Sequence, residues 1–202
     1  MTISGRSSSR TSRRGDQTRE QILTAARKLF AERGYYQTSV YDLFEQAGIT
    51  KGAFFHHWKT KEELALAILE DIKDSFETNF FAGASQGRAR ERIERLLRRM
   101  VDLNTSEDWI YGRIFALWCA EMHSAEGSIE PAVHALRARW CMHWQELIRH
   151  AQQEHDLRSD ISAENLSFLV VCAISGVHLM SGRNSVESTR IAFETLRRTL
   201  LT

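Results

Sequence analysis

Apolar residues in this chain recur every three to four positions, the spacing of an α-helix with one buried face. The first such stripe runs between residues 18 and 33 and consists of Ile22, Ala25, Ala26, Leu29 and Phe30. Gly34 follows it directly, and glycine is common just beyond the end of a helix. The pattern predicts a first helix that carries this stripe and ends at Gly34.

The next stripe is short and consists of Val40, Leu43, Phe44 and Ala47. Gly48 follows it and can supply the left-handed backbone conformation that a tight helix end requires. Thr50 can then cap a second short helix over residues 51–58. Two short helices joined by a glycine-containing turn form a helix-turn-helix unit.

The second of these short helices has two different faces. At helical spacing Phe54 and Trp58 share one face, whereas Gly52, Phe55 and His56 lie on the other. A helix that enters a DNA major groove needs this division, with apolar anchors behind and small or hydrogen-bonding groups in front. An ordinary helical corner with solvated polar residues would give a similar pattern, so the motif alone leaves both interpretations open.

The sequence on either side of the motif helps to decide between a DNA-binding helix and an ordinary helical corner. Residues 19–40 are REQILTAARKLFAERGYYQTSV and residues 47–64 are AGITKGAFFHHWKTKEEL. This stretch resembles the DNA-binding domain of the TetR/AcrR family of bacterial transcription regulators. The family commonly has a tyrosine where this chain has Phe55, a phenylalanine at Trp58 and a small residue at Phe44. From the motif and the resemblance together, we expect DNA contacts from Tyr36, Thr38, Thr50, Lys51, Gly52, Ala53, Phe55, His56 and Lys61.

Longer apolar stripes continue after residue 60. They predict helices over residues 61–80, 88–104, 107–123, 131–154, 164–181 and 186–201. The chain has one proline and no alternating valine- or threonine-rich run, which argues against strands. We therefore expect an all-α fold of about nine helices. The resemblance implies that a three-helix DNA-binding domain over residues 16–62 is joined by the fourth helix to a larger ligand-binding and dimerisation domain over residues 63–202.

Charge is distributed unevenly along the chain. Residues 1–62 carry 11 basic and 6 acidic residues, a net charge of +5, and the remainder carries −4. Residues 1–15 contain four arginines and no acidic residue, and their composition predicts a disordered basic arm. A basic head on an acidic body is typical of a protein whose head binds nucleic acid.

Four of the five tryptophans lie on the two predicted helices over residues 107–123 and 131–154. They indicate either an aromatic core or a pocket for an apolar or aromatic ligand. In the family that the chain resembles, this half binds small molecules. The expected ligand-binding residues are Trp109, Phe115, Trp118, Cys119, Met122, Trp140, Trp144, Phe168 and Cys172.

The predicted helix over residues 164–181 is apolar on nearly every side, so it must be buried on two sides. The resemblance implies a homodimer, with the last two helices of each copy forming a four-helix interface. The alternative is that both helices complete a core within one chain.

Neither enzyme motifs nor ligand sets for a metal are evident. The chain has no phosphate loop, dinucleotide fingerprint or nucleophile elbow, and its histidines lack metal-ligand spacing. We expect no catalytic residues, no metal and no cofactor. Three widely separated cysteines suit a reducing cytoplasm and are expected to be inert buried thiols, with a redox sensor as the alternative. No apolar run reaches the roughly 18 residues of a membrane span.

The sequence thus favours a cytoplasmic, homodimeric repressor that binds a palindromic operator in double-stranded DNA. A small apolar or aromatic molecule would release it from that operator. Three alternatives stay open: a helical protein-interaction module, a regulator without a small-molecule ligand, and a small helical enzyme that uses the aromatic pocket.

Overall fold

The computed structural model describes residues 7–81, 86–103, 109–122, 128–180 and 186–201. Within these ranges the secondary structure is helical throughout, as the apolar spacing predicts. The chain divides into two compact units, residues 1–68 and residues 69–202. The division falls inside helix α4 (Lys61–Ser75), so one continuous helix contributes to both units.

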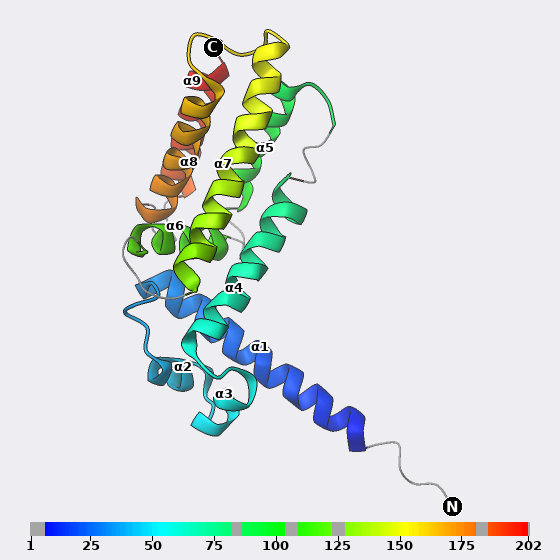
Figure 1. Ribbon diagram of the computed structural model, residues 1–202, viewed down its shortest axis with the longest axis vertical. Helices are drawn as coiled ribbons and strands as arrows, with labels where there is room; N and C mark the ends of the chain where they lie inside the picture. The colour runs from blue at the N-terminus through cyan, green and yellow to red at the C-terminus, as the bar shows by residue number, and fades with distance from the viewer. Residues whose placement is uncertain (1–6, 82–85, 104–108, 123–127, 181–185, 202) are drawn as a thin grey trace, which may run out of the picture. The chain divides into compact units, whose positions relative to one another are not determined.

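The first unit contains α1 (Ser7–Arg33), α2 (Val40–Ala47), α3 (Lys51–His57) and the start of α4 (Figure 1). α1 packs against both short helices. Its apolar stripe forms the core of this unit together with one residue from each short helix and the start of α4. The fully buried hydrophobic members are Ile22, Ala26, Phe30, Leu43, Phe54, Leu64, Ala65 and Ile68.

α1 begins earlier than the sequence predicts. The composition of residues 1–15 predicted a disordered arm, and the family resemblance implied a helix from about residue 18, but α1 starts at Ser7. Once a helix is nucleated, each further residue adds one backbone hydrogen bond, and residues 7–17 contain no proline to prevent this. Residues 1–6 of the predicted arm lie outside the described residues.

The second unit continues from α4 through a π-helical turn, η1 (Phe76–Phe81), into five helices. These are α5 (Ala89–Leu103), α6 (Trp109–Glu121), α7 (Ile129–Gln153), α8 (Ala163–Met180) and α9 (Val186–Leu201). α7 packs on α8, α9 on both α5 and α8, and α6 on α8 (Figure 1). The sequence predicted an uninterrupted helix over residues 61–80 and did not predict η1.

α6 and α8 approach closely at one point. A Cβ atom added to Gly112 would lie 2.4 Å from Cε1 of the buried His178, so only glycine leaves room for the imidazole. The neighbouring Arg113 donates from Nη1 to the carbonyl oxygen of His178 at 2.8 Å. This hydrogen bond joins α6 to the last turn of α8.

α8 is the most apolar helix among the described residues. Its 18 residues, Ala163–Met180, have the length and hydropathy of a membrane span, so the expectation that no segment reaches this length was wrong. Of that segment, 39% is buried inside the protein. One side packs in the bundle core through Leu166, Val170, Val171 and Ile174. Its other side is exposed and still apolar, at Phe168, Leu169, Leu179 and Met180.

Candidate functional site

The turn between α2 and α3 is fixed by local hydrogen bonds. Ser39 caps α2 through a reciprocal pair with Asp42: the Asp42 N–H donates to Ser39 Oγ at 3.1 Å, and the Ser39 N–H donates to Asp42 Oδ2 at 2.8 Å. Gly48 ends α2 with φ 64°, in the left-handed region that favours glycine. Thr50 caps α3 by accepting from the Ala53 N–H at 3.2 Å. The sequence predicted Gly48 and Thr50 in these roles.

α3 has the two faces that its apolar spacing predicts. Phe54 and Trp58 are buried, and the Arg19 guanidinium of α1 lies 5.4 Å from the centroid of the Trp58 ring. The opposite face is available to a partner. It consists of the exposed residues Lys51, Gly52, Phe55 and His56. A Cβ added to Gly52 would meet no atom within 4 Å, so this stretch of backbone is open to close approach.

Phe55 is a hydrophobic residue on that exposed face, with 43% of its surface exposed. Its ring is supported by two other phenylalanines. The centroids are 5.3 Å apart for Phe54 and Phe55 and 6.2 Å apart for Phe44 and Phe55, both in edge-to-face geometry. The Lys51 ammonium lies 5.9 Å from the Phe55 centroid. Two of the residues at which this chain departs from the family's usual pattern, Phe44 and Phe55, are therefore in contact.

Lys61 lies at the start of α4, as predicted, but its ammonium interacts with the protein itself. Nζ donates to the carbonyl oxygen of Tyr35 at 2.9 Å and to that of Thr38 at 2.8 Å. It also lies 4.1 Å from the centroid of the Tyr35 ring. Lys61 thus holds the loop between α1 and α2 in place, a role that the sequence gave no reason to expect.

Thr38 requires a correction. It was expected to contact DNA, but its side chain is fully buried and its hydroxyl donates to the Gly34 carbonyl oxygen at 2.7 Å. Its hydroxyl therefore stabilises the loop and is not presented to a partner. Tyr36, two residues earlier, is 49% exposed and rests edge-on against Tyr35, so it remains available.

In the second unit the predicted ligand-binding residues separate into two groups. Phe115, Trp118, Met122, Trp140 and Trp144 are buried, and Cys119 is half-buried. Burial raises the pKa of the Cys119 thiol to about 12, which keeps it protonated and unreactive at neutral pH. The side chain of Trp109 lies outside the described residues.

Phe168 and Cys172 belong to the other group and correct the prediction. Phe168 is 65% exposed and Cys172 is exposed, so neither lines an interior pocket within one chain. Both lie on the outward side of α8. The sequence could not distinguish this side from the buried one because the helix is apolar nearly all round.

The η1 turn places three phenylalanines around one tryptophan. The Trp140 ring lies 4.2 Å from Phe76, 5.0 Å from Phe80 and 5.1 Å from Phe81, centroid to centroid. Phe115 of α6 contacts Phe76, and the centroids of these two rings are 5.6 Å apart. Trp144 packs on Phe80, and its buried Nε1 has no hydrogen-bond acceptor among the residues that the structure describes. We call these six residues the aromatic cluster.

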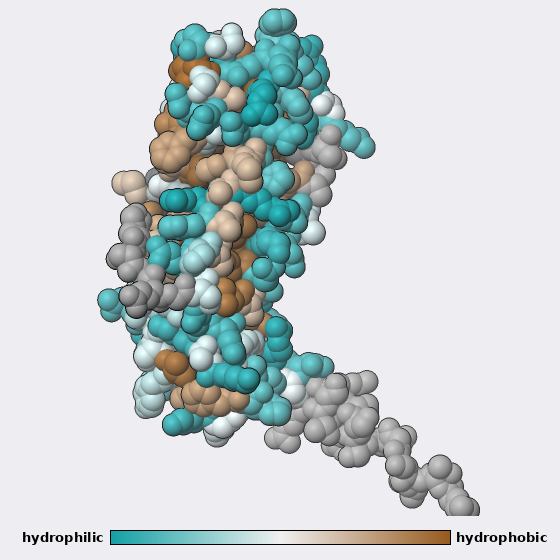
Figure 2. All heavy atoms as spheres, in the orientation of Figure 1, coloured by the Kyte–Doolittle hydropathy of each residue, from teal (hydrophilic) through white to brown (hydrophobic). Residues whose placement is uncertain are grey.

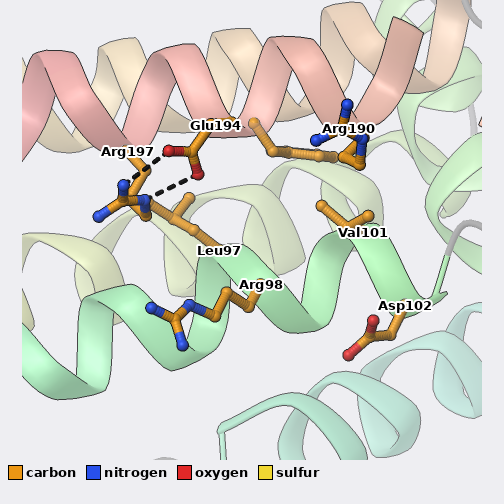
Figure 3. Close-up of a pocket in the computed structure, with 8 residues that line it drawn as sticks. Leu97, Arg98, Val101, Asp102, Arg190, Glu194 and Arg197 are labelled. Atoms are coloured by element: carbon orange, nitrogen blue, oxygen red, sulfur yellow. Dashed lines mark hydrogen bonds and ion pairs between the residues drawn. The ribbon is translucent and has the colours of Figure 1, made fainter. Parts of the chain in front are cut away.

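A groove of about 300 Å³ lies elsewhere in this unit, between α5 and α9 (Figure 3). Its floor includes the buried Leu97 and Phe193, and arginines and acidic residues form its rim. Arg197 is paired with Glu194 of its own helix at 2.6 Å, and Arg190 with Glu187 at 2.6 Å. None of the predicted ligand-binding residues lines this groove.

Two family models match the chain. One, described as bacterial regulatory proteins of the tetR family, covers residues 22–68. The other, described as a tetracyclin repressor-like C-terminal domain, covers residues 85–200. The first range includes the whole helix-turn-helix unit, and the second includes α5 to α8 and most of α9.

Individual proteins are similar to this chain in part or throughout. The HTH-type transcriptional regulator TtgR of Pseudomonas putida is 38% identical over 66 residues, which are 33% of this chain and 31% of that protein. The chain thus matches about a third of that relative's length. The crystal structure of the MbdR regulator from Azoarcus sp. CIB has a TM-score of 0.79 at 24% identity, over 92% of this chain and 97% of that one.

AibR, solved in complex with isovaleryl coenzyme A and operator DNA, has a TM-score of 0.77 at 19% identity, over 91% of this chain and 98% of that one. At such identities the two solved structures show a shared fold. The matching family models describe transcription regulators and not enzymes. Because one of them spans more than half of the chain, this protein belongs to the TetR family of bacterial regulatory proteins.

Proposed function

We propose that this protein is a cytoplasmic transcription repressor that binds a palindromic operator in double-stranded DNA as a homodimer. A small apolar or aromatic molecule releases it. The main evidence for DNA binding is the composition of the exposed face of α3. There Lys51, Gly52, Phe55 and His56 are exposed, while Phe54 and Trp58 anchor the helix from behind. A recognition helix needs this arrangement in order to contact base edges without losing its packing.

Exposed apolar residues on α8 and α9 support the dimer. Phe168, Leu169, Leu179, Met180 and Ile191 are all exposed in the single chain. Figure 2 shows hydrophobic residues at the surface along α8. Large exposed apolar residues that gather on one side usually mark an interaction site. A two-fold dimer would present one α3 helix from each copy to a palindromic operator.

The aromatic cluster supports the effector site. The buried Trp144 Nε1 lacks an acceptor among the described residues, and such a donor is costly to leave unsatisfied. An effector with an aromatic or apolar body and one acceptor oxygen would stack on Trp140 and accept from Trp144 Nε1. The AibR structure, which contains isovaleryl coenzyme A and operator DNA, illustrates this kind of dual binding on the same fold.

A second candidate, a regulator without an effector at this position, is favoured by the packing of Trp140. Its ring already contacts Phe76 and Phe80 at centroid distances of 4.2 and 5.0 Å, as in a filled core. An effector would then have to displace these phenylalanines. Because η1 follows α4 directly, such a displacement would act on the helix that both units share.

The test begins with the full-length protein and a pool of random DNA duplexes. Repeated selection should enrich a near-palindromic sequence, and its affinity should fall as salt rises, because cationic side chains release counterions from phosphates. Enrichment of no sequence would contradict the proposal. Apolar and aromatic compounds that raise the melting temperature are then added to the complex. If one of these compounds releases the wild-type protein from the operator but does not release Trp140→Leu, the result would favour the effector site over the second candidate.

A further inference from the structure

We infer that Phe55 recognises the C5-methyl group of a thymine at a fixed position in each half of the operator. This inference rests on the proposed function, in which α3 enters the major groove.

The first argument is chemical. A phenyl ring carries no hydrogen-bond donor or acceptor, so it cannot bind a phosphate oxygen or the polar edge of a base. The thymine methyl is the apolar group that normal base pairs expose in the major groove. An exposed phenylalanine on a helix in that groove therefore has one well-matched target, an A·T pair with its methyl turned toward the ring.

The second argument is the rigidity of the ring. Phe54 and Phe44 contact Phe55 with interplanar angles of 83° and 71°, so two edge-to-face contacts from α3 and α2 fix its orientation. Phe54 is itself fully buried, which ties this support to the core. A side chain that is already ordered loses little entropy when it binds, and this favours a specific contact over a variable one.

The third argument is the surroundings of Phe55. Lys51 lies 5.9 Å from the ring centroid and can neutralise a phosphate while the ring faces the bases. The open backbone at Gly52, one residue along from Lys51, leaves room for the duplex to approach. The ring thus shares the exposed face of α3 with a cationic group and a stretch of backbone without a side chain, which suits contact with the groove floor.

The test uses the duplex selected from the random pool by the full-length protein. Each thymine is replaced singly by deoxyuridine, which keeps base pairing and removes only the methyl. For the wild-type protein, one position in each half-site should lose about fourfold in affinity per replacement, the effect of about one buried methyl group. Phe55→Ala should bind the thymine and the uridine duplexes equally at that position.

Lys51→Ala is the matched control. It should weaken binding to both duplexes while it preserves the fourfold ratio, because it removes a phosphate contact and leaves the ring. If no thymine of the enriched duplex shows the effect with the wild-type protein, the inference is wrong while the proposed function stands. A ratio that persists in Phe55→Ala would assign the methyl contact to another residue and also overturn the inference. If no duplex is enriched, both the inference and the proposed function fail.

Discussion

Two lysines of the first unit show how position decides the role of a residue. Lys51 is exposed at the first turn of α3, whereas the half-buried Lys61 donates to two backbone carbonyls of the loop between α1 and α2. Hydrogen bonds from a charged donor stabilise more than neutral ones. The two ammonium groups should therefore act on different properties, DNA affinity for Lys51 and stability for Lys61.

Replacing each lysine by alanine separates these properties. Lys51→Ala should reduce the slope of log affinity against log salt by about one, with no change in melting temperature. Lys61→Ala should lower the free energy of unfolding by about 1–3 kcal/mol, because two carbonyls lose a charged donor. Thermal unfolding and salt titrations of operator binding measure both effects. A Lys61→Ala protein of wild-type stability would refute the structural role.

A buried histidine gives the stability of the second unit a dependence on pH. Burial, and then the nearby Arg113, lowers the pKa of His178 to about 4, below the usual 6.5. The unfolded chain therefore binds a proton between pH 6.5 and 4 that the folded chain does not. Stability should be unaffected by this group above pH 6.5 and should fall as pH decreases below it.

Between pH 7 and pH 5 protonation of His178 should lower the free energy of unfolding by about 2 kcal/mol. Urea unfolding of the wild-type protein at the two pH values should show a decrease in the free energy of unfolding that includes this contribution. In His178→Gln, which keeps a polar side chain but cannot be protonated there, the loss should be smaller by the same amount. An identical pH dependence in both proteins would show that His178 does not cause it.

At the scale of the helices, apolar spacing and capping rules predicted a feature correctly wherever the residues that determine it lie close together in the sequence. Gly48, Thr50 and the division of α3 into a buried and an exposed face follow from spacing and capping, and the structure confirms them. The Ser39–Asp42 capping pair was missed although its spacing is visible in the sequence. The carbonyls that bind Lys61 lie 23 and 26 residues away in the chain, and no local pattern indicates such partners.

The same limit explains the errors in the second unit. Phe168 and Cys172 were assigned to an interior pocket because α8 is apolar on nearly every side. Which of its sides packs inward depends on where α6, α7 and α9 lie. The π-helical turn η1 likewise arises where Phe76, Phe80 and Phe81 pack around Trp140, a tertiary arrangement that helical periodicity alone does not encode.

Two glycines at the helix-turn-helix offer a test at this scale. Gly48→Ala should destabilise the protein by about 1–2 kcal/mol, since φ is 64° and an L-residue is strained there even without a steric neighbour. Gly52→Ala should instead stabilise it by up to about 1 kcal/mol, because alanine favours a helix. The added methyl should nevertheless weaken operator binding. Melting curves and binding isotherms of both variants distinguish the two roles, and unchanged operator affinity in Gly52→Ala would contradict close approach of DNA to that backbone.

At the scale of the whole molecule, the exposed apolar side of α8 is a feature that one chain leaves uncovered among the described residues. The outward residues Phe168 and Leu169 are followed at helical spacing by Cys172 and then by Leu179 and Met180. If two copies cover this surface for each other, every substitution in it occurs twice in the dimer. A single mutation should therefore have a large effect on assembly and a small one on the fold of each chain.

Phe168→Glu is the most direct test of this interface. The side chain is 65% exposed in one chain, so the substitution should leave the helical content unchanged. In a two-fold dimer it removes two buried rings, each contributing about 1.5–3 kcal/mol, and so weakens association by at least about a hundredfold. Sedimentation velocity at micromolar concentration should show a monomer, and operator binding should weaken with it. Gln153→Glu, an equal change of charge at an exposed position on α7, should remain dimeric. A dimeric Phe168→Glu protein would mean that the two copies meet through another surface.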